Sequence, residues 1–172
     1  MIGFFNVNKL VKKYLISYFK SIRRMLFLYS NLTVMNQRAY DLKNIRPDFS
    51  TTTINNSMSS DERFQNLVLR PIIKFQNDIL IEVFKNYVSK HKNVFYDLSL
   101  EKRMDYVENA VQKDMKFRNS IKGMIIGLFT VEEYALYIKN SSALNKRMMN
   151  IAKDHLLNHI QLFEKPEILT AV

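Results

Sequence analysis

The scarcity of glycine and proline is the feature that most constrains the fold of this chain. Only three residues of each type occur among 172. A β-sandwich or β-barrel needs a turn about every ten residues, and such turns draw largely on glycine and proline. Hydrophobic residues make up 47% of the chain, which is enough to form a folded core. The sequence therefore predicts an all-α protein.

Two capping signals indicate where helices begin. Ser59 precedes Glu62 by three residues, and Thr130 precedes Glu133 by the same spacing. This arrangement is typical of a capping box, in which a hydroxyl and a carboxylate satisfy the free N–H groups at a helix start. Apolar residues at helical spacing follow both signals.

Two positions are expected to interrupt these helices. Pro71 lacks an N–H and should kink or restart the helix that reaches it. The helical spacing of apolar residues is lost around 116–120, which predicts a bend there. Four to five helices with short connections predict a compact bundle.

The expected organisation has four parts. Residues 1–34 form a basic amphipathic extension, 35–58 a polar linker, 59–165 the helical domain and 166–172 a tail. The linker prediction depends on a polar composition rich in serine, threonine and asparagine.

The extension holds six of the 26 basic residues and none of the 16 acidic ones. Its apolar residues recur at helical spacing, at Val11, Leu15, Tyr18, Ile22, Met25 and Tyr29. Its bases Lys9, Lys13, Lys20 and Arg24 fall on another face. Three interpretations stay open: an upstream extension created by a misplaced start codon before Met35, a disordered tail, or an anchor for an anionic membrane or RNA.

The most suggestive segment for binding is 113–122, where bases alternate with an aromatic residue, Phe117. Arg118 and Lys122 are four apart and share a helical face, where they can meet phosphates or an acidic protein surface. The predicted partner-binding residues are Arg118, Asn119, Lys122, Lys146 and Arg147. The alternative is a solvated helix face beside a bend.

Catalytic and metal-binding signals are sparse. The chain has no cysteine, which excludes disulfides, thiolate-ligated metals and thiol nucleophiles. His155 and His159 are four apart and are the only plausible metal-ligating pair, with two solvent-facing histidines as the alternative. No residue is nominated as a nucleophile and no cofactor is expected; the residues favour a non-enzymatic protein, with an enzyme left open as the alternative.

Several segments resemble a small, uncharacterised bacterial family of helical proteins. The similarity covers about residues 58–163 and is carried by Ser60–Asn66, Leu69–Asn77, Lys116–Gly123, Phe129–Tyr134 and Leu144–Met148. Members of this family are sometimes labelled automatically as glyoxalase, and they usually start near Met35. The resemblance defines no catalytic residues to carry over to this chain.

The preferred functional interpretation is a non-enzymatic cytoplasmic adaptor that contacts a protein or RNA through its basic polar face. One alternative, taken from the family label, is a glyoxalase-like metal-dependent lyase acting on a small aldehyde adduct. Another is membrane-surface association through the basic helix of residues 1–34. No apolar run approaches the roughly 20 residues of a membrane-spanning helix, and no small-molecule substrate is expected.

Overall fold

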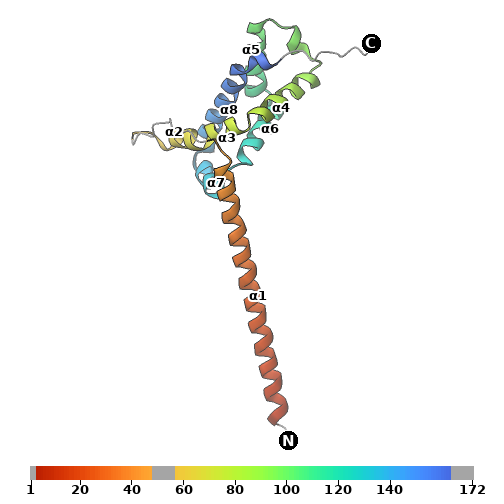
Figure 1. The fold of residues 1–172 in the computed structure, drawn as a ribbon, viewed down its shortest axis with the longest axis vertical. Helices are drawn as coiled ribbons and strands as arrows, with labels where there is room; N and C mark the ends of the chain where they lie inside the picture. The colour runs from red at the N-terminus through yellow and green to blue at the C-terminus, as the bar shows by residue number, and fades with distance from the viewer. Residues whose placement is uncertain (1–2, 48–56, 164–172) are drawn as a thin grey trace. The chain divides into compact units, whose positions relative to one another are not determined.

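In the computed structural model, the backbone is described for residues 3–47 and 57–163, and side chains for 12–30, 37–47 and 57–163. These residues form helices and turns and no strand, which confirms the all-α class. The elements in chain order are α1 (Gly3–Asn44), α2 (Ser60–Phe64), the π-helix η1 (Gln65–Leu69), α3 (Arg70–Phe75), α4 (Asn77–Lys90), the 3-10 helix η2 (Val94–Asp97), α5 (Leu100–Gln112), α6 (Met115–Ile126), α7 (Val131–Tyr137), the 3-10 helix η3 (Ile138–Asn140), α8 (Ser141–Asn158) and the 3-10 helix η4 (Ile160–Leu162) (Figure 1). The described part of the chain thus has more helical segments than the four to five expected, because several expected helices are interrupted.

The chain divides into two compact units, Met1–Lys43 and Asn44–Val172. The first consists of α1, a single uninterrupted helix. Residues 35–44 were expected to begin a polar linker and instead continue this helix. No glycine or proline lies between Gly3 and Pro47, and a Gln37–Asp41 side-chain hydrogen bond of 2.8 Å supports the last turns. The remainder of the expected linker at 48–56 and the expected tail lie outside the described residues.

The second unit opens with a capped helix. The Ser59 hydroxyl accepts from the Glu62 N–H, and the Glu62 carboxylate accepts from the Ser59 N–H, which confirms the predicted capping box. Thr130 and Glu133 form the same reciprocal pair at the start of α7, also as predicted.

Pro71 restarts the helical path rather than ending it. The chain widens into η1 just before it, where the Arg70 N–H reaches the carbonyl of Gln65, five residues earlier. A proline ring clashes with the carbonyl four residues before it in a regular α-helix, and the wider π-turn relieves that clash. Pro71 itself lies in the first turn of α3, where its missing N–H costs nothing.

The bend expected around 116–120 lies a few residues earlier. Helix α5 ends at Gln112, and Asp114 starts α6 by accepting hydrogen bonds from the N–H groups of Lys116 and Phe117. Residues 116–120 are therefore inside α6. The carboxylate cap decides the boundary because it satisfies two otherwise free N–H groups.

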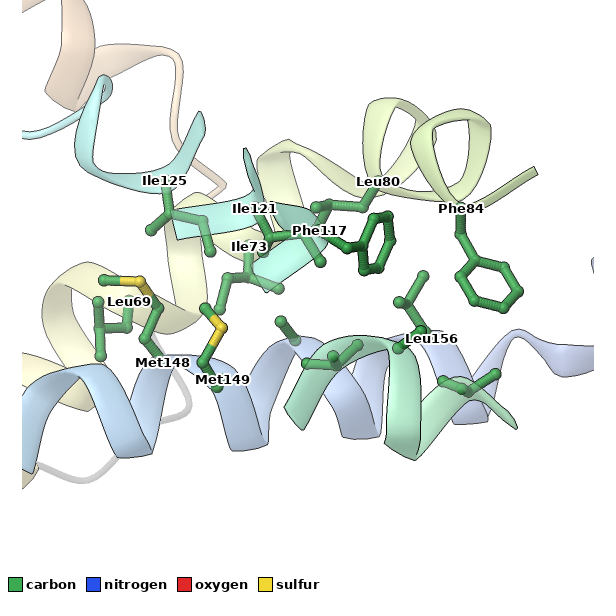
Figure 2. Close-up of a cluster of buried hydrophobic side chains, with 14 of the residues drawn as sticks. Leu69, Ile73, Leu80, Phe84, Phe117, Ile121, Ile125, Met148, Met149 and Leu156 are labelled. Carbon is green, nitrogen blue, oxygen red and sulfur yellow. The ribbon is translucent and has the colours of Figure 1, made fainter. Parts of the chain in front are cut away.

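Helix α8 is the centre of the second unit, since it lies against α3, α5, α6 and η1. Its buried methionines and leucines meet isoleucines of α3 and α6 (Figure 2). At one end of this core, Phe84 of α4 is fully buried and packs its ring against Phe95 and Phe163 at centroid distances of 5.4 and 4.7 Å. The aromatic cluster joins α4 to the end of the described chain.

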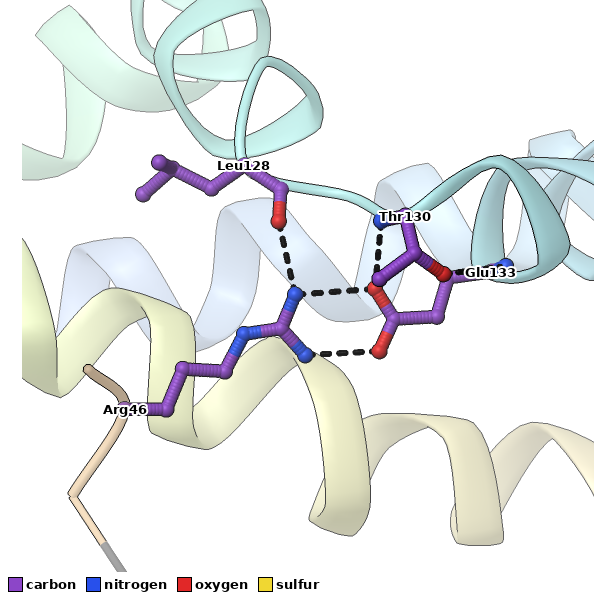
Figure 3. A network of polar contacts seen from close by, with 4 residues as sticks. All are labelled: Arg46, Leu128, Thr130 and Glu133. Atoms are coloured by element: carbon purple, nitrogen blue, oxygen red, sulfur yellow. Dashed lines mark hydrogen bonds and ion pairs between the residues drawn. The ribbon is translucent and has the colours of Figure 1, made fainter. Parts of the chain in front are cut away.

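Arg46 fixes the beginning of the second unit to α7. Its guanidinium donates to both carboxylate oxygens of Glu133, at 2.6 and 2.8 Å, and to the carbonyl of Leu128 at 2.6 Å (Figure 3). Glu133 is the same residue that completes the capping box with Thr130. One buried carboxylate therefore serves both a helix start and a long-range ion pair.

Candidate functional site

Helix α1 carries an uninterrupted apolar face. At about 100° per residue, eight large apolar side chains between residues 12 and 30 fall within about 140° of its circumference, with no charged residue of that stretch among them. This apolar arc consists of Tyr14, Leu15, Tyr18, Phe19, Ile22, Met25, Leu26 and Tyr29. All eight side chains are exposed. A helix face of this size is unusual on a protein surface, where large contiguous apolar patches mark interaction sites.

The other side of α1 carries its positive charge. Between residues 12 and 30, the bases lie within about 120° of each other on the helix circumference and form the basic arc, which consists of Lys12, Lys13, Lys20, Arg23 and Arg24. All five are exposed. Ile16 and Phe27 interrupt this arc, and Leu28 lies just beyond it. Lys9 and Val11 of the predicted stripes lie outside the described side chains.

The predicted partner-binding residues are distributed over two helices of the second unit. Arg118, Asn119 and Lys122 lie on α6, where Arg118 and Lys122 are half-buried beside the core face and Asn119 is exposed. None of these three side chains hydrogen-bonds or pairs with another residue of the described chain.

Lys146 and Arg147 lie on α8 and face different neighbours. Arg147 donates a 2.7 Å hydrogen bond to the side chain of Gln65 in η1. Asn150, one turn after Lys146 on α8, accepts a hydrogen bond from Gln112 of α5. Because residues four apart share a helix face, Lys146 lies toward α5. The side-chain geometry thus supports a basic face on α6 more than one continuous face that includes Arg147.

The histidine pair lines a pocket that the sequence patterns did not indicate. Arg70 and Lys74 of α3 and Asn77 of α4 lie on one side of this pocket, with His155 and His159 of α8 on the other. The two imidazole rings lie against each other, with centroids 4.5 Å apart. Arg70 and Lys74 are four residues apart on one helix, and this spacing was the signal that could have identified them.

Hydrogen bonds fix both rings. The Nε2 of His155 bonds the Asn77 side-chain oxygen at 2.7 Å, and the Nδ1 of His159 donates to the carbonyl of His155 at 2.8 Å. Burial, with a smaller contribution from neighbouring His159, lowers the pKa of His155 below its usual value of 6.5. The Nε2–H of His155 donates to the amide oxygen of Asn77, and the lowered pKa favours the neutral ring.

Each ring of the pair is engaged through one nitrogen, His155 through Nε2 to Asn77 and His159 through Nδ1 to the His155 carbonyl. A metal would have to bind the remaining nitrogens together with further ligands. Across the parts of the chain whose side chains are described, no group of three His, Cys, Asp or Glu residues is placed to hold a metal ion. The glyoxalase-like alternative, which requires a bound metal, gains no support from this geometry.

Asp114 has a structural role at the start of α6. Its Oδ2 accepts a 3.2 Å hydrogen bond from the Tyr87 hydroxyl, while its Oδ1 accepts the two backbone bonds that cap the helix. The Phe117 N–H and, to a smaller extent, the Tyr87 hydroxyl and the Lys116 N–H lower the pKa of Asp114. Burial, followed by the charge of Asp114, raises the pKa of Tyr87 to about 12.

Comparisons of the chain with models of protein families, with curated proteins and with solved structures find no match. None of the helices that the structure describes has both the length and the hydropathy to cross a lipid bilayer.

Proposed function

We propose that the protein attaches to anionic membrane surfaces through α1. The observation that carries this proposal is the segregation of side chains on that helix into an exposed apolar arc and a basic arc. A helix of this kind lies in the plane of the membrane, with its apolar side among the acyl chains and its bases at the headgroups.

The residue types of the apolar arc suit an interfacial position. Tyr14, Tyr18 and Tyr29 combine an apolar ring with a polar hydroxyl, and such side chains concentrate at the boundary between lipid and water. Phe19, Leu26 and their neighbours supply purely apolar area. The arc therefore offers both hydrophobic contact area and hydroxyl groups.

The positive charge of the helix favours membranes with anionic lipids. Residues 1–34 contain six bases and no acid, so negatively charged headgroups complement them along the whole segment. Each base near an anionic surface contributes about 1 kcal/mol, an attraction that salt screens. Pairing of two copies through residues 12–30 is disfavoured by the same charges, because that stretch contains no acid to face the bases of the other copy.

Vesicle flotation of the full chain tests this function. We expect binding to vesicles of phosphatidylcholine with about a third phosphatidylglycerol, weaker binding to phosphatidylcholine alone, and release at high salt. Equal binding to neutral and anionic vesicles, or binding to neither, contradicts the proposal.

A matched pair of double variants isolates the apolar arc. Phe19→Ser with Leu26→Ser removes side chains of the arc that are 65% and 64% exposed. Phe27→Ser with Leu28→Ser makes the same chemical change to side chains outside the arc that are 65% and 60% exposed. We expect the first variant to lose membrane binding and the second to keep most of it. Equal losses of membrane binding in the two variants contradict a helix that faces the membrane with the apolar arc. If the first variant changes its oligomeric state and keeps its membrane binding, the arc serves self-association instead.

The function also requires that the native chain contain residues 1–34. The intact mass of the protein from its natural source tests this directly. A species that begins at Met35 excludes the proposal.

A second candidate function is contact with a macromolecular partner through the basic face of α6. The favouring observation is that Arg118, Asn119 and Lys122 share one side of the helix and are not engaged by other described side chains. Partner recovery with and without nuclease, compared between wild type and Arg118→Glu with Lys122→Glu, tests this candidate. Identical recovered partners exclude this face.

A further inference from the structure

A pocket of about 680 Å³ opens where α3, the start of α4 and the end of α8 meet. Its polar lining includes Arg70, Lys74, Asn77, Asp154, His155 and His159. All these residues belong to the second unit, so the pocket is independent of α1 and of the membrane function proposed above.

The charges in this pocket favour an anion. Arg70 and Lys74 carry permanent positive charge, and the two imidazoles can add to it. Asp154 is the one carboxylate of the lining, and it lies 3.9 Å from the ammonium of Lys153, which offsets part of its charge. Arg70 makes no hydrogen bond or ion pair with another residue of the described ranges, so its guanidinium fork is available to a ligand.

We propose that this pocket binds the dianionic phosphoryl group of a small phosphorylated molecule. The Arg70 guanidinium supplies the paired donors that match two phosphoryl oxygens. His159 supplies a third donor when its ring is protonated, because its Nδ1–H already donates to the carbonyl of His155 and only the imidazolium carries a second N–H, on Nε2, for a ligand. Ile73 and Ile151 line the same pocket and form an apolar wall for the organic part of the ligand.

Binding and protonation are coupled at this site. The charged and titratable groups around His155 are Arg70 and Lys74 from α3, and Asp154 and His159 from α8, while α4 contributes the neutral Asn77. An anion next to His155 favours its protonated form and offsets the burial that lowers its pKa. The affinity for a dianion therefore rises as pH falls, by about tenfold where binding raises the pKa of His155 by one unit.

The experiment is a titration of the full chain with sulfate and with inorganic phosphate, followed by the NMR signals of the His155 and His159 rings. Sulfate keeps two negative charges between pH 5.5 and pH 7.5 and so isolates the protonation of the protein. We expect both ring signals to shift with one saturation curve, and the affinity for sulfate to increase from about pH 7.5 to about pH 5.5. Chloride at equal ionic strength serves as the reference.

Arg70→Gln and Arg63→Gln form a matched pair. Both residues are exposed and helical, but Arg63 lies in α2 and lines a different pocket. We expect Arg70→Gln to weaken binding about tenfold or more, as for the loss of a charge-assisted hydrogen bond, and Arg63→Gln to leave it within about twofold. Circular dichroism of each variant verifies the fold.

A lipid headgroup offers the same phosphoryl chemistry as a free phosphate. A second arm therefore uses vesicles of phosphatidylcholine with phosphatidic acid and the Phe19→Ser/Leu26→Ser variant, in which α1 is disabled. An Arg70-dependent shift of the histidine signals in either arm supports the site and identifies the source. Absence of a shift in both arms, or equal weakening by Arg70→Gln and Arg63→Gln, overturns the proposal while leaving membrane binding by α1 unaffected.

Discussion

Arg46 and Glu133, which are 87 residues apart in the sequence, form a bidentate ion pair. Only 8% of the Arg46 side chain and 11% of the Glu133 side chain are exposed. The pair attaches the first described residues of the second unit to the start of α7. The Nε of Arg46 is buried without a partner among the described atoms, so the guanidinium is held mainly by Glu133 and by the Leu128 carbonyl.

Arg46→Ala should destabilise the second unit by about 3–5 kcal/mol, because it leaves the Glu133 carboxylate buried and unpaired. Urea unfolding measures this loss. Lys85→Ala is the control, since it breaks the exposed Lys85–Glu82 pair and should cost no more than about 0.5 kcal/mol. Similar losses for the two variants would show that Arg46 is not an effective buried anchor.

Phe84→Ala should cost about 3–5 kcal/mol, since the ring is completely buried and its removal leaves a cavity among aromatic side chains. Phe75→Ala makes the same change at a ring that is 43% exposed and should cost less than about 1 kcal/mol. Thermal or urea unfolding compares the two. A small effect at Phe84 would contradict the aromatic cluster as part of the core.

Asp114→Asn should lower the pKa of Tyr87 from about 12, but only in part, because burial is the larger cause of the shift and remains. NMR of labelled tyrosine measures the titration, with Asp154→Asn as a control that should leave it unchanged. The pKa of Tyr87 is higher in the folded protein than in the unfolded chain. The neutral hydroxyl therefore contributes fully to the free energy of unfolding below about pH 10, and this contribution is lost as pH rises toward 12. An unchanged titration in Asp114→Asn would rule out the Tyr87–Asp114 contact.

His159→Gln should raise the pKa of His155 while leaving it below 6.5, because burial is the first cause of its depression and His159 the second. NMR titration of the His155 ring measures this, with His91→Gln as the control. Because the pKa of His155 is lower in the folded protein than in the unfolded chain, the neutral ring contributes to the free energy of unfolding above about pH 6.5. This contribution declines as pH falls toward the pKa of His155 in the folded protein. A His155 pKa at or above 6.5 in the wild type would contradict its burial against Asn77.

The helix starts were predictable because their determinants are local. Ser59 with Glu62 and Thr130 with Glu133 form capping boxes whose partners are three residues apart, so the sequence alone indicates them. The predicted bend lies a few residues too far along the chain, because the apolar spacing is lost only after 115, whereas the carboxylate of Asp114 already starts α6. A short polar cap can override the periodicity of the residues that follow it.

The long-range features could not be predicted in the same way. Arg46 lies in a segment that the composition assigned to a linker, and its partner is determined only by the fold. Arg70 and Lys74 carry the correct spacing for one helix face, but the pocket exists only because α8 brings His155 and His159 against α3 and α4. Spacing identifies residues that share a face, whereas tertiary packing decides what that face meets.

The wide turn at η1 sets the rotational phase of α2 relative to α3. A π-turn inserts one residue into a helical path, which rotates the preceding segment by about 100° relative to a regular α-helix. This rotation allows Phe64 to meet Phe129, with ring centroids 5.6 Å apart, while Ile72 and Ile73 beyond Pro71 remain in the core. Deleting a single residue from Gln65–Leu69 would therefore preserve the helix and still misdirect α2, so this short stretch tolerates substitution better than a change in length.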